Sequence, residues 1–296
     1  MAKFVTMQSV PMYRHKKSPH KYSFPQLLSC VLLKIYMKNI SYRDLEELLI
    51  SWSDVQGELG LRAVPDHSTL CRAQHRVTNK QIQRILEKVV EIVANKITRA
   101  ILFACDSTGF KEDVASFYYA LRSKKKRRRW IKAVYLLDTR TQLCVSQLIT
   151  RGPSGDAREL GRLEDKSALE LIIEVMDRGF DGAGNFRLGI PFRIIPPIRR
   201  GGSIKGWKRV VEYVIYLVAK WTGIYGKRWI CETMNSVIKR KFGDSIRERK
   251  ERNKKRIVSL MAIVYNIHVI VRAEGKIRAL IALLYLHKID VCNKAK

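Results

Sequence analysis

Acidic residues are scarce in this chain of 296 residues. Asp and Glu together number 27 whereas Lys and Arg number 57, so the formal net charge at pH 7 is +30. Such an excess opposes compaction and is typical of proteins that act on a polyanion. Nucleic acid is the first candidate partner, and an anionic membrane surface is the second. Hydrophobic residues make up 46% of the chain, which excludes a chain that is disordered throughout.

The sequence also lacks long apolar runs, a signal peptide and metal-binding cysteine motifs. The longest apolar runs, at residues 27–33 and 280–286, are far shorter than the roughly 20 residues that a bilayer span needs, so we expect no membrane partner. Residues 1–6 contain no apolar core before a cleavage site, which predicts no secretory signal. The 6 cysteines form no Cys-x-x-Cys pair and the 6 histidines show no zinc spacing. Structural zinc and disulfides are therefore disfavoured, and a reducing cytoplasm fits best.

Residues 1–97 are predicted to form a helical, basic N-terminal domain. Residues 1–22 are polar and basic and are predicted to be a loose arm. Residues 41–44 have the pattern of a capping box, and apolar residues recur on one helical face of residues 82–97. Short basic helices joined by turns suit DNA docking. A helical packing domain with solvated charges explains the same pattern equally well.

The hydrophobic period changes near residue 100, where a second predicted domain, residues 98–296, begins. A turn at residues 138–141 predicts a hairpin, and from about residue 207 the pattern is helical. The strand-like runs occupy residues 101–105, 117–121, 131–137, 143–149, 171–176 and 192–195. This order of elements predicts an α/β fold with a mixed sheet flanked by helices.

Two of the predicted strands end in an aspartate, Asp106 and Asp177. A carboxylate at the end of a buried strand costs free energy unless a positive charge lies beside it. A basic side chain can supply that charge in a salt bridge. A divalent metal can supply it as well, since Mg²⁺ binds carboxylates together with substrate phosphates.

A third acid, Glu232, lies in a predicted helix that ends at Gly243. At about 100° per residue, Arg228, Glu232 and Lys239 fall on one face of this helix, and Tyr225 begins that face. Apolar residues occupy the opposite face, which is expected to pack on the sheet or on another helix. An Arg–Glu pair four residues apart is commonly a surface feature, so the helix alone leaves the function open.

These residues resemble a known signature. Tyr225, Arg228, Glu232 and Lys239 leave two, three and six residues between successive members, a spacing similar to the Tyr-Arg-Glu-Lys signature of the DDE transposases of prokaryotic insertion sequences. Three further segments resemble the same family. Residues 103–109 are similar to its first-aspartate strand, and residues 177–181 to its second-aspartate motif, with Phe180 where Tyr is usual. Residues 64–72 are similar to a stretch of its N-terminal region. The resemblance covers residues 25–270.

The resemblance implies a ribonuclease-H-like catalytic core. Asp106, Asp177 and Glu232 would be its catalytic and metal-binding residues, holding two divalent ions, Mg²⁺ or Mn²⁺, against one phosphodiester. The implied reaction is cleavage of double-stranded DNA at the terminal inverted repeats, followed by transfer of the freed 3′-OH into target DNA. The resemblance further implies a dimer on DNA in a prokaryotic cytoplasm, associated with the nucleoid.

The resemblance also assigns the DNA contacts near the cut to Tyr225, Arg228 and Lys239. Two basic segments are predicted to contact phosphates because they concentrate cations beside the sheet: Lys124, Lys125, Lys126, Arg127, Arg128 and Arg129 in one, and Arg199 and Arg200 in the other. Three tryptophans of the C-terminal part are predicted to lie in the core: Trp207, Trp221 and Trp229.

Three alternatives to a transposase remain open. The first is a metal-dependent nuclease or resolvase on the same fold that cuts DNA without joining it; the helical N-terminal region, which suggests recognition of particular DNA ends, disfavours it. The second is a catalytically dead, DNA-binding relative, which the presence of all three acids disfavours. A membrane-surface protein ranks last, because the basic residues do not follow one amphipathic helix.

Overall fold

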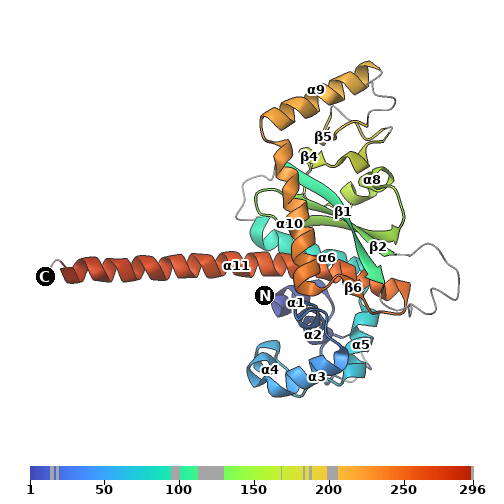
Figure 1. Ribbon diagram of the computed structural model, residues 1–296. Helices are drawn as coiled ribbons and strands as arrows, with labels where there is room; N and C mark the ends of the chain where they lie inside the picture. Colours follow the sequence, from blue (N-terminus) through green and yellow to red (C-terminus); the bar gives the residue numbers. More distant parts are fainter. Residues whose placement is uncertain are drawn as a thin grey trace.

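The computed structural model describes residues 1–13, 17, 20–94, 101–112, 130–167, 169–182, 184–186, 189–198 and 206–294; for residues 276–294 it describes the backbone alone. A central sheet lies between a group of N-terminal helices and helix α9, and helix α11 passes beside the sheet and projects away from the body (Figure 1). The predicted strand at residues 117–121 lies outside the described residues.

The sheet is mixed, as predicted, and has the ribonuclease-H-like arrangement that the resemblance implies. Its strand order is β3-β2-β1-β4-β5, and a short β6 pairs with the far end of β1. β1, β2 and β3 are antiparallel neighbours, whereas β4 and β6 run parallel to β1 and β5 runs parallel to β4. The strands are β1 (Leu102–Glu112), β2 (Trp130–Asp138), β3 (Cys144–Gly152), β4 (Ile173–Met176), β5 (Phe192–Ile194) and β6 (Ser245–Ile246).

The predicted hairpin between β2 and β3 is confirmed. Its turn is stabilised by Asp138, whose carboxylate accepts hydrogen bonds from the backbone amides of Arg140 (3.3 Å) and Thr141 (3.0 Å). Such aspartate turns replace the backbone bonds that the reversing chain gives up. Every residue of β2 after Trp130 is buried, because both faces of the sheet are covered.

The N-terminal region is helical, as predicted, but its first residues are not a loose arm. Residues 2–9 form helix α1, where Val5 and Thr6 are buried against α2 and α6. The hydroxyl of Thr6 lies 3.0 Å from that of Ser29 on α2. The prediction was wrong because the basic residues at positions 14–21 hid the short apolar face that precedes them. The helices are α1 (Ala2–Ser9), α2 (Phe24–Tyr36), α3 (Tyr42–Ser51), α4 (Ser53–Leu59), α5 (His67–Arg76) and α6 (Asn79–Ala94).

Local signals define where these helices begin. Ser41 and Asp44 form the predicted capping box of α3, each side chain accepting a hydrogen bond from the other residue's backbone amide. Ser23 and Gln26 form a second capping box before α2. Both pairs satisfy amide groups that a helix leaves unbonded at its start.

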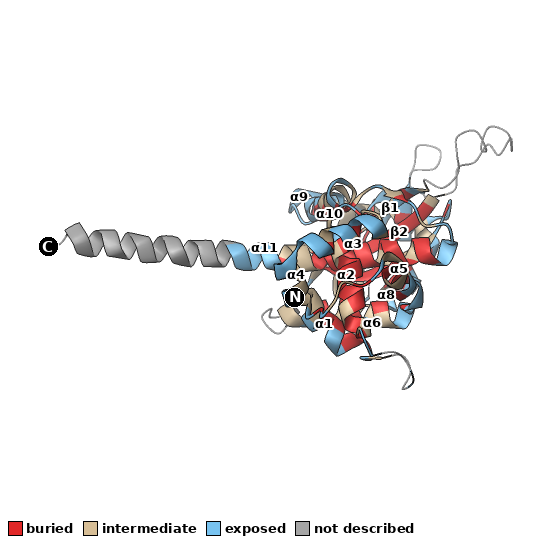
Figure 2. Cartoon of the chain, turned by 90° about the horizontal axis from the view of Figure 1, so that it is seen from below, coloured by how far each residue is buried: buried red, intermediate tan, exposed pale blue. Residues whose placement is uncertain are grey.

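Helix α11 (Glu251–Lys294) joins the N-terminal helices to the sheet. It contacts α2, α6 and β3, and the side chain of Asn266 bonds both the amide and the carbonyl of Cys144 at 2.8 Å. Within the described residues, its Glu251–Gly275 part is long and apolar enough to cross a membrane, but 56% of its apolar window is buried inside the protein. The inner part of α11 is largely buried (Figure 2), as in the core helix of a folded domain.

The remaining helices follow the sheet strands. They are α8 (Leu160–Glu164), α9 (Trp207–Trp221) and α10 (Trp229–Val237), with short 3₁₀ turns at Asp156–Arg158, Arg178–Phe180 and Tyr225–Arg228 and a π-helical turn at Ile238–Phe242. One hydrophobic cluster includes buried residues of α1, α2, α6, α10, α11 and one face of the sheet, while a second cluster lies under α8 on the other face. The predicted boundary at residue 97 lies in residues 95–100, outside the described part.

Candidate active site

The first predicted catalytic residue, Asp106, lies in the middle of β1. Along this strand Ala104 contributes to the cluster on the α10 side of the sheet and Cys105 to the cluster on the other side. Because side chains alternate along a strand, Asp106 points to the α10 side. There it accepts a 3.0 Å hydrogen bond from the side-chain amide of Asn235 on α10.

Asp177 is placed beside Asp106 by the pairing of two parallel strands. Cys105 of β1 pairs with Met176 of β4, and in both strands the next residue is an aspartate. Met176 belongs to the same cluster as Cys105, so the alternation turns Asp177 to the same side of the sheet as Asp106. The Asp177 carboxylate accepts a 2.8 Å hydrogen bond from the amide of Arg178 and thereby begins the following turn.

Glu232 comes from α10, which packs across β1 and β2. The helix buries Ile230, Cys231 and Met234 toward the sheet, which leaves the Glu232 side chain 56% exposed. Its carboxylate forms a 2.7 Å ion pair with Arg228, four residues earlier. The turn that carries Arg228 contacts both β1 and β4, so this pair lies beside the strands that hold the two aspartates.

The three carboxylates influence one another electrostatically. Burial raises the pKa of Asp106 from 3.8 to about 6; the amide of Ser107 and the charge of Arg228 oppose this shift, whereas the negative charges of Asp177 and Glu232 add to it. Crowded carboxylates resist ionisation together. A cation placed among them would relieve that repulsion.

The donor set fits a hard divalent cation, since carboxylate oxygens are the ligands that Mg²⁺ and Mn²⁺ prefer. Within the described residues, however, the ligand atoms of Asp106, Asp177 and Glu232 do not all lie within 4.8 Å of one another. Asp177 is engaged with its own turn and Glu232 with Arg228. Both of these side chains are exposed, so packing does not lock either carboxylate in its present position.

The other three signature residues lie on one continuous helical segment, but it is not the single α-helix that was predicted. Tyr225 and Arg228 are in a 3₁₀ turn, and Lys239 is in the π-helical turn that follows α10. Tyr225 packs edge-on against Tyr216 with ring centroids 4.9 Å apart. Lys239 Nζ lies 6.0 Å from the ring centroid of Phe110. The predicted helix end at Gly243 is confirmed, and its φ of 104° is one that glycine adopts readily.

Comparison with known proteins gives the family. A family model described as a transposase DDE domain matches residues 98–267, more than half of the chain. The chain belongs to the DDE transposase family. The match covers the sheet, α10 and the buried part of α11, and thus every residue of the candidate site.

No curated protein matches this transposase-family chain. Among solved structures, the chain is similar to the piggyBac transposase in a synaptic complex with hairpin DNA, at 12% sequence identity and a TM-score of 0.41, over 93% of this chain and 72% of the other.

The predicted core role of three tryptophans in this DDE-family chain is wrong. The exposed fractions of Trp207, Trp221 and Trp229 are 67%, 88% and 52%. Helix α9 is attached to the body by polar and apolar contacts: Arg209 forms an ion pair with Asp181 and, within the helix, one with Glu212 (2.8 Å), while Ala219 and Ile215 pack in the main hydrophobic cluster. The amphipathic pattern showed that α9 has an apolar face, but not which face meets the protein.

The basic segments predicted to contact DNA phosphates lie outside the described residues. This concerns Lys124, Lys125, Lys126, Arg127, Arg128 and Arg129, and likewise Arg199 and Arg200. Residues 113–129 connect β1 to β2, and residues 199–205 precede α9 in the sequence. Their contacts with DNA stay predictions.

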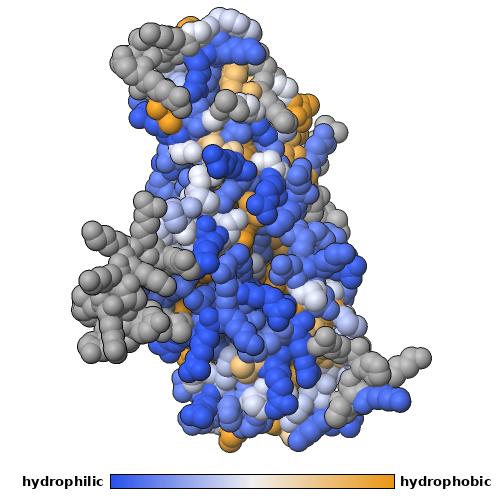
Figure 3. Space-filling model, turned by 90° about the vertical axis from the view of Figure 1, so that its right-hand side faces the viewer, coloured by the Kyte–Doolittle hydropathy of each residue, from blue (hydrophilic) through white to orange (hydrophobic). Residues whose placement is uncertain are grey.

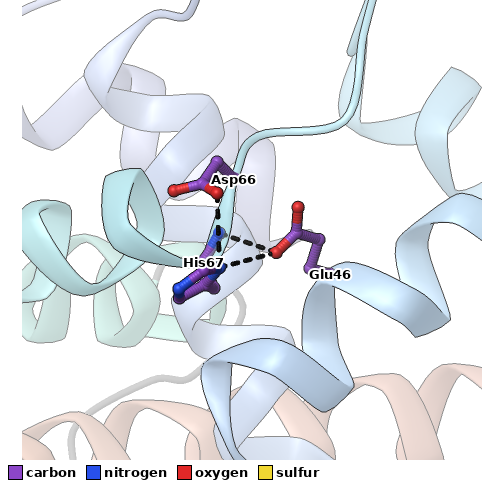
Figure 4. Close-up of side chains that lie close together, drawn as sticks. All are labelled: Glu46, Asp66 and His67. Carbon is purple, nitrogen blue, oxygen red and sulfur yellow. Dashed lines mark hydrogen bonds and ion pairs between the residues drawn. The ribbon is translucent and has the colours of Figure 1, made fainter.

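A second group of metal-ligating side chains lies in the N-terminal region, within the sequence stretch that resembles other transposases. His67 Nδ1 is 3.0 Å from Glu46 and 3.2 Å from Asp66 (Figure 4). Glu46 also accepts a hydrogen bond from the His67 amide, and Asp66 caps α5 by accepting one from the Ser68 amide. These bonds tie α3 to the start of α5, which is a structural role.

Asn235 is the site residue that sequence reasoning missed. It follows Glu232 by three residues, so it lies next to that acid on the helix surface, yet it faces the sheet and bonds Asp106. The only signal in the sequence is a polar residue close to the apolar face of α10. That signal does not distinguish a partner of Asp106 from a residue at the edge of the interface.

Proposed function

We propose that this protein is a transposase of the Tyr-Arg-Glu-Lys group that cuts double-stranded DNA at the ends of an insertion sequence and joins the freed 3′-OH to target DNA. The observation that carries the proposal is the register between β1 and β4, which puts Asp106 and Asp177 directly after paired residues of neighbouring strands. The raised pKa of Asp106, caused by burial and opposed by Arg228, supports a site built to receive positive charge.

Two divalent ions, Mg²⁺ or Mn²⁺, are the cofactor that we propose for Asp106, Asp177 and Glu232. Bound there, they would supply activation of the attacking oxygen and stabilisation of the leaving one. The protein's own part is to hold the carboxylates. Asn235 orients Asp106, and Arg228 keeps Glu232 close to the strands.

DNA is the proposed partner, and the net charge of +30 supports it. Arg228 and Lys239 would hold phosphates on either side of Glu232, and Tyr225 would position the backbone near the cut. Burial raises the pKa of Tyr225 to about 12, with the charge of Arg228 opposing that shift, so the phenol keeps its proton and can donate a hydrogen bond to a phosphate oxygen.

We propose that residues 1–97 form the domain that recognises the DNA ends. In this region a cavity of about 400 Å³ is lined by aromatic and basic side chains, among them Tyr13, Tyr22, Arg72 and Arg76. Cations beside aromatic rings suit contact with a nucleic-acid strand. Two element ends must be held together for transposition, so the active form would be a dimer on DNA, in the cytoplasm of a prokaryote and at its nucleoid.

The test is a cleavage and joining assay on duplex DNA that spans the boundary of the element. With Mg²⁺ or Mn²⁺, the wild type should nick at the boundary and then produce joined DNA. Glu232→Gln should abolish both products while DNA binding persists. Glu251→Gln, a change in an exposed glutamate paired with Arg151 and Lys255 far from the site, is the matched control and should leave nicking intact.

Each alternative function has its own outcome in this assay. Nicking without any joined product would identify a nuclease or resolvase. Binding without nicking at any metal concentration would identify a catalytically dead relative. Normal nicking by Glu232→Gln would show that the carboxylate assignment is wrong.

A further inference from the structure

Helix α9 presents an apolar face to solvent. Trp207, Val210, Val214, Val218 and Trp221 are all exposed, and the exposed fraction of Trp221 reaches 88%. On the face of the molecule shown in Figure 3, several hydrophobic areas lie in the upper part, at the height of α9 in Figure 1. Contiguous apolar surface of this kind on a folded protein commonly marks a site of association.

The inner face of α9 carries both polar and apolar contacts. Glu212 is buried on this face and forms an ion pair with Arg209, which also pairs with Asp181. Ala219 is buried in the main hydrophobic cluster, and Ile215 packs against that cluster. A surface helix usually shows charges on its outer face. The outer face of α9 instead carries exposed tryptophans and valines, which are available to another surface.

The order of residues along the stripe reads the same in both directions. Trp207, Val210, Val214, Val218 and Trp221 are separated by three, four, four and three positions, with a tryptophan at each end and valines between. At about 100° per residue, all five lie within roughly 40° of Val214 around the helix axis. An antiparallel copy of the same helix would therefore place each tryptophan against the other tryptophan and each valine against a valine.

We propose that α9 is a self-association surface: it binds α9 of a second copy of this chain, antiparallel, with the two-fold axis at Val214. A two-fold interface requires a patch that complements itself, and this stripe has that property in both spacing and residue type. Spacings of three and four residues are also those with which helices interlock side chains. This surface would be the interface of the dimer proposed above. Only the purpose of that dimer, which is to hold two DNA ends, rests on the proposed function.

The placement of α9 gives this dimer a role near the site. Four positions after the end of α9, Tyr225 begins the turn that carries Arg228 and leads to Glu232. Helix α9 also contacts that turn, and Tyr216 packs on Tyr225. Docking of a second α9 therefore buttresses the segment that positions the signature residues in both copies.

The interface is small, so we expect a weak dimer in free solution. A helix of 15 residues is about 22 Å long. The area that two such helices bury against each other lies at the lower end of the range for protein interfaces. Lys208 and Lys220 flank the stripe and add like charge to both partners. Salt screens that repulsion, so dimerisation should strengthen between low salt and about 0.5 M salt, opposite to the expected trend for DNA binding.

Sedimentation velocity of the full-length protein without DNA tests the proposal. The wild type should shift from monomer to dimer as its concentration rises through the micromolar range, whereas Val214→Glu should stay monomeric because it places two like charges on the axis. Val271→Glu is the matched control: Val271 is 49% exposed on α11 and Val214 is 50% exposed on α9. The control should dimerise like the wild type. A monomeric wild type at all concentrations, or a dimer that Val214→Glu leaves intact, overturns the proposal.

Cysteine crosslinking tests the orientation of the helices and does not depend on how a charged variant folds. Val214→Cys should give a disulfide-linked dimer under mild oxidation, because residue 214 meets itself at the axis in the proposed pair. Trp207→Cys should not, because position 207 lies opposite 221; a Trp207→Cys crosslink would mean parallel helices and would contradict the proposal.

These measurements use neither DNA nor metal, so failure of the proposed cleavage activity would leave them unaffected. Conversely, Val214→Glu could leave the sedimentation behaviour the same as that of the wild type but lower the affinity for a DNA duplex. That result would show that the stripe binds DNA instead of a second copy. That result would refute the self-association surface while leaving the proposed reaction in place.

Discussion

The side-chain amide of Asn235 donates a 3.0 Å hydrogen bond to Oδ2 of Asp106 and so joins α10 to the central strand of the sheet across 129 residues of sequence. A hydrogen bond to a carboxylate favours its charged form and fixes its orientation. The bond therefore opposes the effect of burial, which raises the pKa of Asp106. It also ties Asp106 to the helix that carries Glu232.

Removal of this bond should slow the reaction without preventing folding. We expect Asn235→Ala to lower the rate of DNA nicking by about 10- to 100-fold, the usual range for groups that orient metal ligands. Nicking is measured at saturating Mn²⁺ on the boundary duplex. Thr233→Ala is the control, since Thr233 bonds a carbonyl of its own helix; equal rates for the two variants would contradict the role given to Asn235.

The ionised side chain of Asp106 should lower the free energy of unfolding when no cation is present. Because burial raises its pKa from 3.8 to about 6, the ionised carboxylate is disfavoured in the folded state at neutral pH. Asp106→Asn should raise the free energy of unfolding by about 1–3 kcal/mol at pH 7.5, since one pKa unit corresponds to about 1.4 kcal/mol, while it abolishes nicking. Thermal unfolding measures the gain.

Two controls separate this effect from a general one. Asp177→Asn removes the bond to the Arg178 amide from an exposed side chain and should not raise the melting temperature. Added Mn²⁺ should stabilise the wild type more than Asp106→Asn, because a ligand that binds only the folded state raises its stability. If Asp106→Asn instead destabilised the protein, the favourable interactions of the Asp106 carboxylate would fully offset the cost of burying its charge.

Glu174 should make stability fall as the pH rises. It is buried in β4 beside Arg193 of β5, which it shares with Glu164; the distance from Arg193 Nε to the Glu174 carboxylate is 3.4 Å. Burial, together with the charge of Glu164, raises the pKa of Glu174 far above 4.5 despite Arg193. The folded state thus retains a proton that the unfolded state releases above pH 4.5, and stability declines from there up to the folded pKa.

Glu174→Gln should remove this dependence. The variant should be as stable as the wild type near pH 5 and more stable at pH 9, as measured by urea unfolding at the two pH values. Glu170→Gln, at an exposed position just before β4, should follow the wild type at both. A variant that is less stable at pH 9 would indicate that Glu174 is ionised and paired with Arg193 in the folded protein.

Arg228 should contribute to DNA affinity through charge. We expect Arg228→Gln to weaken binding to all duplex sequences by a similar factor and to reduce the slope of log affinity against log salt by about 1. Fluorescence anisotropy at several salt concentrations gives the slope. Arg162→Gln is the control, because Arg162 is exposed on α8, which covers the opposite face of the sheet; an equal change in both slopes would argue against a local contact.

The sequence predicted the parts of the fold that periodicity determines. The strand predicted to end at Asp106 continues to Glu112 as β1, but the strand that ends before Asp177, the hairpin at Asp138 and the capping box at Ser41 are present in the structure. Each depends on neighbours in sequence. The two aspartates come directly after paired residues because β1 and β4 pair in a particular parallel register. The order of the strands along the chain does not determine that register.

Other features could not be read from the sequence for physical reasons. The orientation of α9 depends in part on Asp181, a residue 28 positions before its partner Arg209. The burial of Val5 depends on surfaces from α2 and α6. Strand β6 has two residues, too few to show an alternation. In each case a distant contact decides the local structure.

The three acids come from three separate elements, and the last of them follows the others along the chain by more than fifty positions. A shortened product that stops before residue 225 would keep both aspartates and a large share of the positive charge but would lack Glu232 and its helix. Such a fragment would also lack β6 and α11, whose buried residues belong to the main hydrophobic cluster. The C-terminal part of the chain therefore supplies the third acid and completes the core on which the two aspartates rest.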